Sequence, residues 1–286
     1  GMDGAFALDC SDLKGRKLLN LDSEIEGVFT VSCAGGMRAD CHLPGTMEPV
    51  AGMAGYAITL AGLQGGHSGA DIHLGRASAN QVMGRVLYSA MERFHGLRLA
   101  AVSGGQFDNV ICSRCDAAVT IPAGKEAEFE AFIAEFDAIL KNEYAGCDDG
   151  ITLTCAKTGV TAAISEVTTN LMLHTLLALP QGVQAMSVDF PGLTQTSLNM
   201  GVLKLEDDGL HITFSIRSSI ASQKEMLAQR VHAIVEFAGG TVTERGKYPG
   251  WQYERDSRFR DMMLEAYHDL TGKEGVVEAT HGGLEC

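Results

Sequence analysis

The middle of the chain carries apolar residues at two different spacings. One recurs every three or four positions, as at Val82 and Val86 in residues 78–94, and predicts a helix. The other alternates with polar residues, as in residues 56–60, and is typical of a half-buried strand. Helices are therefore expected at 78–94, 125–144, 165–179, 222–237 and 256–270, and strands at 56–60, 97–102, 117–121, 151–156, 196–205, 210–220, 241–245 and 275–279.

The helix expected at 165–179 has a clear start and an apolar set. Ser165 is a suitable N-cap, because its hydroxyl can accept a hydrogen bond from the first turn. Leu171, Leu173 and Leu177 are expected to form its buried side.

The order of these elements repeats. From about residue 50 to 245 the pattern gives two successive strand–helix–strand–strand–helix–strand units, at about 50–156 and 157–245. In the second unit, Glu206-Asp-Asp-Gly209 is typical of a hairpin turn. Such units predict antiparallel sheets with helices on one face, so the expected fold is α+β with two tandem ferredoxin-like (βαββαβ) units.

The two ends of the chain differ from this module. Leu18-Leu-Asn-Leu-Asp22 is a short apolar run ending in an acid, as expected of a buried parallel strand with function at its carboxyl end. The strand at 275–279 leads into a glycine-rich loop at 280–286. We expect both ends to belong to a larger unit.

Composition and charge disfavour several kinds of partner. The net charge is −14, from 36 acidic and 22 basic residues, which argues against nucleic acid and anionic membranes. The sequence shows no bilayer-spanning apolar run and no signal-peptide pattern. The eight cysteines are scattered, which favours reduced thiols in a cytoplasmic protein. We interpret the Cys112-Ser-Arg-Cys115 pair as incidental rather than as a zinc or redox site.

Candidate chemistry centres on one histidine. His67 lies in "LAGLQGGHSGA", residues 60–70, among four glycines that allow the backbone to approach a ligand closely. Gly66-His67-Ser68-Gly69 also invites a serine-hydrolase interpretation, but the sharp strand-to-helix turn of a nucleophile elbow does not follow it. Dinucleotide-binding, P-loop and HExxH motifs are absent from the sequence.

Short motifs follow one another in a specific order along the whole chain. They are "GMDGA" at 1–5, "LLNLDSE" at 18–24, "CAGG" at 33–36, "LQGGHSGADIHLG" at 63–75, "GG" at 104–105 with Asn109, "IRS" at 216–218, "YPGW" at 248–251 and "HGGLEC" at 281–286. In this order they resemble the bacterial aminoacyl-histidine (Xaa-His) dipeptidases, carnosinase-like members of the two-zinc amidohydrolase superfamily.

The resemblance implies a fold and an activity. Residues 41–245 would form a lid domain that contacts substrate and makes a homodimer. Residues 1–40 and 246–286 would be parts of an α/β zinc-peptidase domain. The implied reaction is hydrolysis of dipeptides by a water that two zinc ions activate.

The resemblance also implies roles for single residues. His67 would polarise the substrate carbonyl oxygen as negative charge develops on it, and an imidazole N–H suits that task. Asn109 would hydrogen-bond the substrate, and Arg217 would hold its terminal carboxylate, for which a guanidinium fork is well shaped. The loop bordering the substrate pocket would contain His281, Gly282 and Gly283.

Zinc ligands are the part of the family pattern that this sequence mostly lacks. Asp22 matches a ligand of one zinc, but the other ligands and the glutamate base of the family fall before "GMDGA" or after "GLEC". We therefore expect a truncated chain with little or no dipeptidase activity alone, even with added zinc or manganese. The alternative is a non-catalytic lid, dimerisation or peptide-binding module. The histidines that match no family ligand are His42, His73, His95, His174, His211, His232 and His268.

Overall fold

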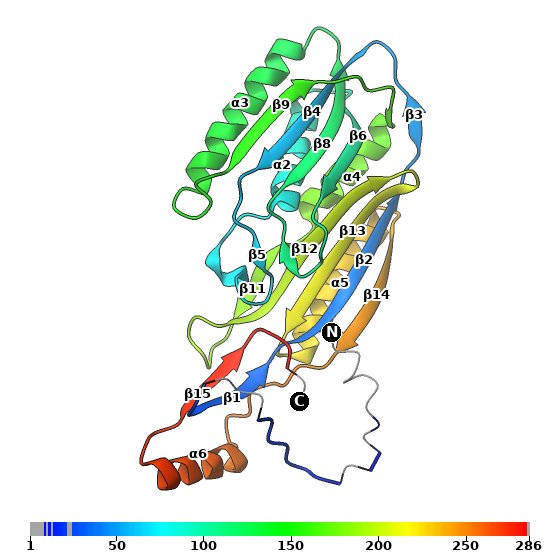
Figure 1. Ribbon diagram of the computed structural model, residues 1–286. Helices are drawn as coiled ribbons and strands as arrows, with labels where there is room; N and C mark the ends of the chain where they lie inside the picture. Colours follow the sequence, from blue (N-terminus) through cyan, green and yellow to red (C-terminus); the bar gives the residue numbers. More distant parts are fainter. Residues whose placement is uncertain (1–8, 10, 13, 22–24, 285–286) are drawn as a thin grey trace.

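The computed structural model describes residues 9, 11–12, 14–21 and 25–284 (Figure 1). Its helices are α2 (Ala79–Arg93), α3 (Glu126–Glu143), α4 (Glu166–Ala178), α5 (Ala221–Phe237) and α6 (Arg258–Thr271), with a short 3-10 turn, η1 (Ile72–Leu74). Its strands are β1 (Val28–Cys33), β2 (Gly35–Pro44), β3 (Met47–Pro49), β4 (Met53–Ala61), β5 (Gly66–His67), β6 (Arg98–Gly104), β7 (Val110–Ile111), β8 (Cys115–Pro122), β9 (Thr152–Lys157), β10 (Ala162–Ile164), β11 (Gly182–Met186), β12 (Thr194–Glu206), β13 (Gly209–Ser218), β14 (Thr241–Tyr248) and β15 (Val276–Thr280).

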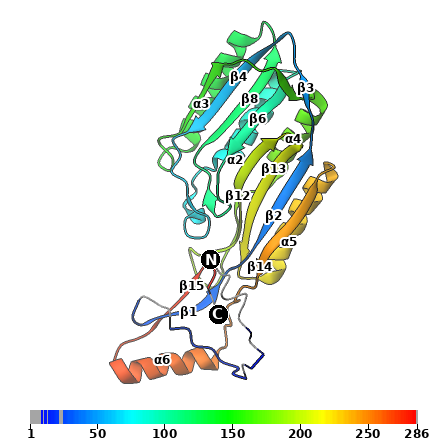
Figure 2. The same ribbon diagram turned by 45° about the vertical axis from the view of Figure 1, so that its right-hand side comes forward.

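Most strands join one large antiparallel sheet. Its order is β14-β2-β13-β12-β6-β8-β4-β9, and β11 also pairs with β12. Helices α3, α2, α4 and α5 follow one another along one face, while no helix of the described residues lies on the other face (Figures 1 and 2). Tyr56, Phe129 and Phe214 are among the largest side chains buried in the core.

The two halves of the sheet are not consecutive in the chain. The first half contains β4, α2, β6, β8, α3 and β9, as expected. The second half takes its strand between β13 and β14 from β2, which precedes the whole first half. The expectation of two tandem units is wrong in this detail. Strand β2 fits there because its alternate residues are apolar and buried, at Met37, Ala39, Cys41 and Leu43.

A small second body lies at one end of the large sheet. Strand β1 pairs in parallel with β15, and α6 packs beside them through an edge-to-face contact of Tyr267 with Phe29, with ring centroids 5.7 Å apart. The expected domain boundaries, at residues 41 and 245, fall inside β2 and β14. The change from one body to the other therefore lies near residues 34 and 249.

The apolar run before Asp22 does not form the expected buried strand. Leu18, Leu19 and Leu21 are 63%, 52% and 84% exposed, and residues 18–21 have no strand conformation. The physical reason is that no strand of the described residues pairs with them, so they lack a sheet in which to be buried. Asp22 itself lies outside the described residues.

Helix α4 confirms one expectation and corrects another. The Ser165 hydroxyl accepts a hydrogen bond from a backbone N–H of the first turn at 3.2 Å, as an N-cap should. Of the three leucines expected on the buried side, Leu173 is fully buried, whereas Leu171 and Leu177 are 45% and 46% exposed. The helix instead turns the face with Met172 and Leu176 toward the core.

Several expectations from composition can be compared with the structure. No helix in the described residues combines the length and apolarity that a bilayer span requires. None of the six cysteines in this part of the chain forms a disulfide. Burial raises the pKa of both Cys112 and Cys115, which disfavours the thiolate form that metal binding and redox chemistry need.

Candidate functional site

The helix-free face of the large sheet carries a row of polar side chains. On β13, Phe214 and Ile216 point into the core beneath the helices. Successive side chains of a strand point to opposite faces, so Arg217 lies on the helix-free face. It stands at the end of β13 nearest to β1 and β15 (Figure 2).

The Arg217 side chain donates to one tyrosine and has a buried N–H without a partner in the described residues. Its neighbours in register are Ser197 on β12 and Gly36 on β2. The ring of Tyr248 fills the space above Gly36, where a Cβ would lie 2.5 Å from its atoms. Arg217 Nη1 donates to Tyr248 Oη at 3.3 Å, but the buried Nε–H has no hydrogen-bond partner in the described residues. Buried polar groups are rarely left unpaired, so this donor is available to a ligand.

His281 follows β15 directly and is buried beside Arg217. Its side chain is 5% exposed, and its Nε2 lies 2.7 Å from Ser197 Oγ. Burial first, then the charges of Arg217 and His73, lowers the pKa of His281 to about 3, so the imidazole is neutral at pH 7. Its Nδ1 is buried without a partner among the described residues.

The two glycines after His281 hold the loop against the sheet. The Gly282 carbonyl accepts a hydrogen bond from the Ala34 N–H at 3.1 Å, and its own N–H donates to Thr280 Oγ1 at 3.0 Å. A Cβ at Gly283 would lie 3.0 Å from Tyr248 Oη, so a side chain there would push the tyrosine away from Arg217.

The tautomer of His67 is fixed by its own loop. Its Nδ1 accepts hydrogen bonds from the N–H groups of Gly69 and Ala70 at 3.2 and 3.1 Å. Nδ1 therefore carries no proton, and in the neutral ring the proton is on Nε2. Burial and the charge of Arg217 lower the pKa of His67, while Asp71 opposes them. The exposed edge of this ring is thus a neutral N–H donor.

His67 and Arg217 lie next to each other. A Cβ at Gly69 would be 3.0 Å from Cε1 of the imidazole and 3.5 Å from Cζ of the guanidinium. Glycine is needed at this position because the two functional groups close around it. Ser68 is only 1% exposed, and the imidazole nitrogen that could act as its base already accepts backbone N–H groups. The geometry does not support a serine nucleophile.

Asn109 lies on the segment that pairs with the His67 loop. The Asn109 carbonyl accepts the Ser68 N–H at 2.9 Å, and β5 and β7 form a small antiparallel pair. The buried amide of Asn199 donates to the carbonyls on both sides, those of Asp108 and Val110, at 2.9 and 2.8 Å. Asp108 also forms an ion pair with Arg38 of the sheet. The half-buried Asn109 is thereby held near His67.

The described residues around Arg217 do not by themselves form a metal centre. In the described part of the chain, the only group of three or more ligand side chains close enough to share an ion is His42, Asp208 and His211. That group lies at the other end of β13. The proposed ligand Asp22 lies outside the described residues.

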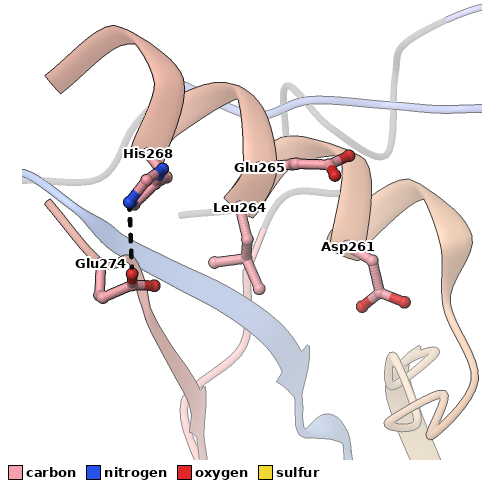
Figure 3. A pocket seen from close by; sticks show the side chains of 5 residues that line it. All are labelled: Asp261, Leu264, Glu265, His268 and Glu274. Carbon is pink, nitrogen blue, oxygen red and sulfur yellow. Dashed lines mark ion pairs between the residues drawn. The ribbon is translucent and has the colours of Figure 1, made fainter. Parts of the chain in front are cut away.

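A shallow hollow of about 400 Å³ on α6 is a separate feature (Figure 3). It contains one imidazole, His268, whose Nε2 lies 3.5 Å from a carboxylate oxygen of Glu274. Asp261 and Glu265 lie along the same helix, and no predicted site residue lines the hollow. We do not assign it to the site.

Comparisons with known proteins agree on one family. Residues 58–147 match the model of a peptidase dimerisation domain. The whole chain is 34% identical to the cytosol non-specific dipeptidase of Escherichia coli (strain K12). It also matches the crystal structure of aminoacylhistidine dipeptidase from Vibrio alginolyticus over 100% of its length, with 33% identity and a TM-score of 0.93. Over its whole length the chain is similar to the aminoacyl-histidine dipeptidases. It spans 59% of the length of each of these two relatives.

In this chain, which is similar to those dipeptidases, the predicted residues His67, Arg217 and His281 come together from three separate segments. The sequence did not assign roles to Tyr248 and Ser197, which contact Arg217 and His281. Tyr248 was visible only as part of the "YPGW" motif, and Ser197 gave no signal because its importance follows from strand register.

Asp148 is a further residue that the sequence did not indicate. It is fully buried, and its carboxylate accepts the backbone N–H of Gln64 at 2.6 Å and that of Ala77 at 2.7 Å. These two residues lie on either side of the loop that carries His67. One buried carboxylate therefore holds both ends of the loop.

Asp148→Asn is expected to destabilise the protein by about 1–3 kcal/mol, because an amide offers only one oxygen to two N–H donors, one buried and one partly buried. Urea unfolding at pH 7 measures this difference. The control is Asp149→Asn, the same change at the exposed neighbour, whose carboxylate accepts one exposed backbone N–H, from Gly146. Equal losses in the two variants would contradict the role given to Asp148.

The lowered pKa of His281 predicts acid sensitivity. The folded pKa of about 3 lies below the ordinary value of 6.5, so the unfolded chain binds more protons between these values. Stability is therefore full above about pH 6.5 and falls as the pH drops toward 3, by up to about 1.4 kcal/mol per pH unit. Denaturant unfolding at pH 7, 6 and 5 gives the free energy of unfolding at each pH. We expect this free energy to fall less steeply with decreasing pH in His281→Asn than in the exposed-site control His268→Asn.

Proposed function

We propose that this chain supplies the substrate-binding groups of a metal-dependent dipeptidase. The supporting observation is the convergence of Arg217, His281 and His67 around one place on the helix-free face. There, Arg217 Nε and His281 Nδ1 are buried without a partner in the described residues. A site with unpaired buried polar groups and a neutral N–H donor suits a small polar, anionic substrate.

Arg217 is proposed to bind the terminal carboxylate of the dipeptide. Its free Nε–H and adjacent N–H groups match the two oxygens of a carboxylate. Tyr248 fixes one side of the guanidinium, which reduces the ordering that binding would otherwise require. Because His281 is neutral, it places no second positive charge next to Arg217.

His67 is proposed to donate its Nε2–H to the carbonyl oxygen of the scissile bond. When water adds to that carbon, negative charge grows on the oxygen, and a preoriented donor stabilises it more than it stabilises the uncharged substrate. The two backbone N–H groups on Nδ1 orient the ring before substrate arrives. Asn109 is proposed to add a hydrogen bond to the substrate, and the loop of Gly282 and Gly283 to border the pocket.

The metal requirement is proposed from the similarity to these dipeptidases, with zinc as the metal and Asp22 as this chain's ligand. The described residues near Arg217 provide no complete ligand set, so they account for substrate binding and charge stabilisation only.

We interpret the large sheet as a lid built from two ferredoxin-like units. The two halves of the sheet have the orders β9-β4-β8-β6 and β14-β2-β13-β12. When the four strands of each half are numbered in chain order, both halves have the order 4-1-3-2. The first unit is inserted between β2 and α4 of the second. A homodimer through this lid is proposed from the match of residues 58–147 to a peptidase dimerisation domain. Sedimentation equilibrium tests it, since a monomer at micromolar concentrations would exclude it.

Titration of the chain with β-alanyl-histidine, followed by a hydrolysis assay with added zinc or manganese, tests the proposed function. Saturable binding that requires a free carboxylate supports the site. Absence of binding would overturn it. Binding without turnover is expected for the chain alone, and turnover that begins on adding metal would establish the activity directly.

A further inference from the structure

A second cluster of side chains lies at the far end of the same polar face. His42 on β2 and His211 on β13 are directly opposite each other in register. Their neighbours Cys41 and Ile212 are buried in the core, so both imidazoles project from the helix-free face. The rings stack with centroids 4.6 Å apart and an interplanar angle of 25°.

The turn between β12 and β13 places a carboxylate against both rings. Asp208 Oδ1 lies 2.8 Å from His211 Nε2, and Asp208 Oδ2 lies 3.6 Å from His42 Nε2. His42 Nε2 also lies 3.1 Å from the backbone carbonyl oxygen of Asp208, so both imidazoles turn Nε2 toward this residue. The three ligand atoms all lie within 4.8 Å of one another.

We propose that His42, His211 and Asp208 bind a divalent transition-metal ion of the zinc class. Two imidazole nitrogens and one carboxylate oxygen form a ligand set that zinc and its neighbours in the first transition row accept, with water completing the shell. Zinc ligands at about 2.0–2.1 Å from the ion lie roughly 3.4 Å apart. Asp208 Oδ1, at 2.8 Å from His211 Nε2, would move slightly away from it, and more widely separated ligand atoms would move closer together. Asp208 can make this adjustment because its side chain is 65% exposed on a turn.

Neither Glu206 nor Arg217 belongs to this metal site. Glu206 Oε2 lies 3.9 Å from His211 Nε2, but its other oxygen is bound by the Lys204 ammonium at 2.6 Å. We therefore count three protein ligands. His211 is six residues from Arg217 along β13, a separation of about 20 Å, so this site is separate from the proposed peptide site.

A second cluster, around His232, lacks the arrangement needed to bind a metal ion. His232 lies between two carboxylates, with Nδ1 2.7 Å from Glu236 and Nε2 3.3 Å from Glu244. It has one imidazole, and its two nitrogens face opposite directions, so these groups cannot surround one ion. This makes His232 a matched control for a histidine that only pairs with acids.

An ion bound at this site would tie β2 to the β12–β13 turn. The bound state would be favoured over the unfolded chain, so the thermal midpoint would rise with metal concentration. In the chain, β2 precedes the inserted unit β4–β9 and the β12–β13 hairpin follows it, so the ion would connect segments on either side of that unit (Figure 1).

Titration of the chain with Zn²⁺ and with Co²⁺ tests the proposal, with NMR signals of the His42 and His211 rings as the site-specific readout. We expect Zn²⁺ to shift both rings together and Co²⁺ to broaden both. His42→Asn and His211→Asn should each weaken binding at this site at least tenfold and remove the metal-dependent rise in the thermal midpoint. His232→Asn should leave both unchanged.

The outcomes separate clearly. If the His42 and His211 signals do not respond to either metal, the proposal is wrong. It is equally wrong if both variants keep wild-type affinity and the same thermal shift. Where a histidine variant fails to fold by circular dichroism, Asp208→Asn at the exposed turn provides the same comparison, with weakened binding expected.

Discussion

Replacing Arg217 by methionine is expected to weaken binding of a dipeptide by about 30- to 1,000-fold, because removing one member of a desolvated charge pair costs about 2–4 kcal/mol. Methionine retains much of the length of the side chain and removes the donors. The affinity of Arg217→Lys is expected to lie between those of the wild-type protein and Arg217→Met, since an ammonium keeps the charge but cannot form the two-donor fork. Isothermal titration calorimetry with a non-hydrolysed dipeptide gives the dissociation constants.

The decisive comparison is between a dipeptide and its C-terminal amide. The wild-type protein should prefer the free carboxylate strongly, and Arg217→Met should bind the two ligands nearly equally. Arg245→Met is the matched control, because Arg245 lies on β14 and pairs with Asp40 instead of facing the site. A variant at 217 that still prefers the carboxylate would show that another group binds it.

The fold was predictable wherever apolar spacing was regular. The helices at 78–94, 125–144 and 222–237 match α2, α3 and α5 within a residue or two, because each buries a single apolar face. Strand β2 was missed although Met37, Ala39, Cys41 and Leu43 alternate in it, since glycines and charged residues obscured the pattern. Its place between β13 and β14 depends on pairing across about 170 residues, which local spacing cannot reveal.

The site was predictable only where motifs marked it. His67 and Arg217 were indicated by family resemblance, and the structure places them around Gly69. The supporting contacts depend on register and burial instead. Ser197 faces Arg217 because β12 and β13 pair at that position, and Asp148 reaches the His67 loop from the far side of the first unit. In the sequence, Asp148 is followed by Asp149 and a glycine, and nothing in this context indicates that Asp148 is fully buried.

His67→Gln is expected to lower kcat by about 100- to 1,000-fold with little change in KM, as found when one donor to a developing oxyanion is removed. Because the carbonyl oxygen carries little charge before the reaction, the lost hydrogen bond matters mainly in the transition state. The assay uses dipeptide hydrolysis by the active protein that contains this chain. The glutamine amide lacks the acceptor nitrogen through which two backbone N–H groups orient the imidazole, so its own N–H is not held toward the carbonyl oxygen and the hydrogen bond is lost.

The structural part of this prediction can be checked without turnover. NMR of the His67 ring should show a proton on Nε2 and none on Nδ1 at pH 7, with a pKa below the ordinary value because burial and Arg217 disfavour the charged form. The control His95→Gln, at an exposed histidine away from the loop, should leave kcat unchanged. A raised KM with kcat unchanged in His67→Gln would contradict this role, because that pattern is the loss of an interaction made equally in the bound substrate and the transition state.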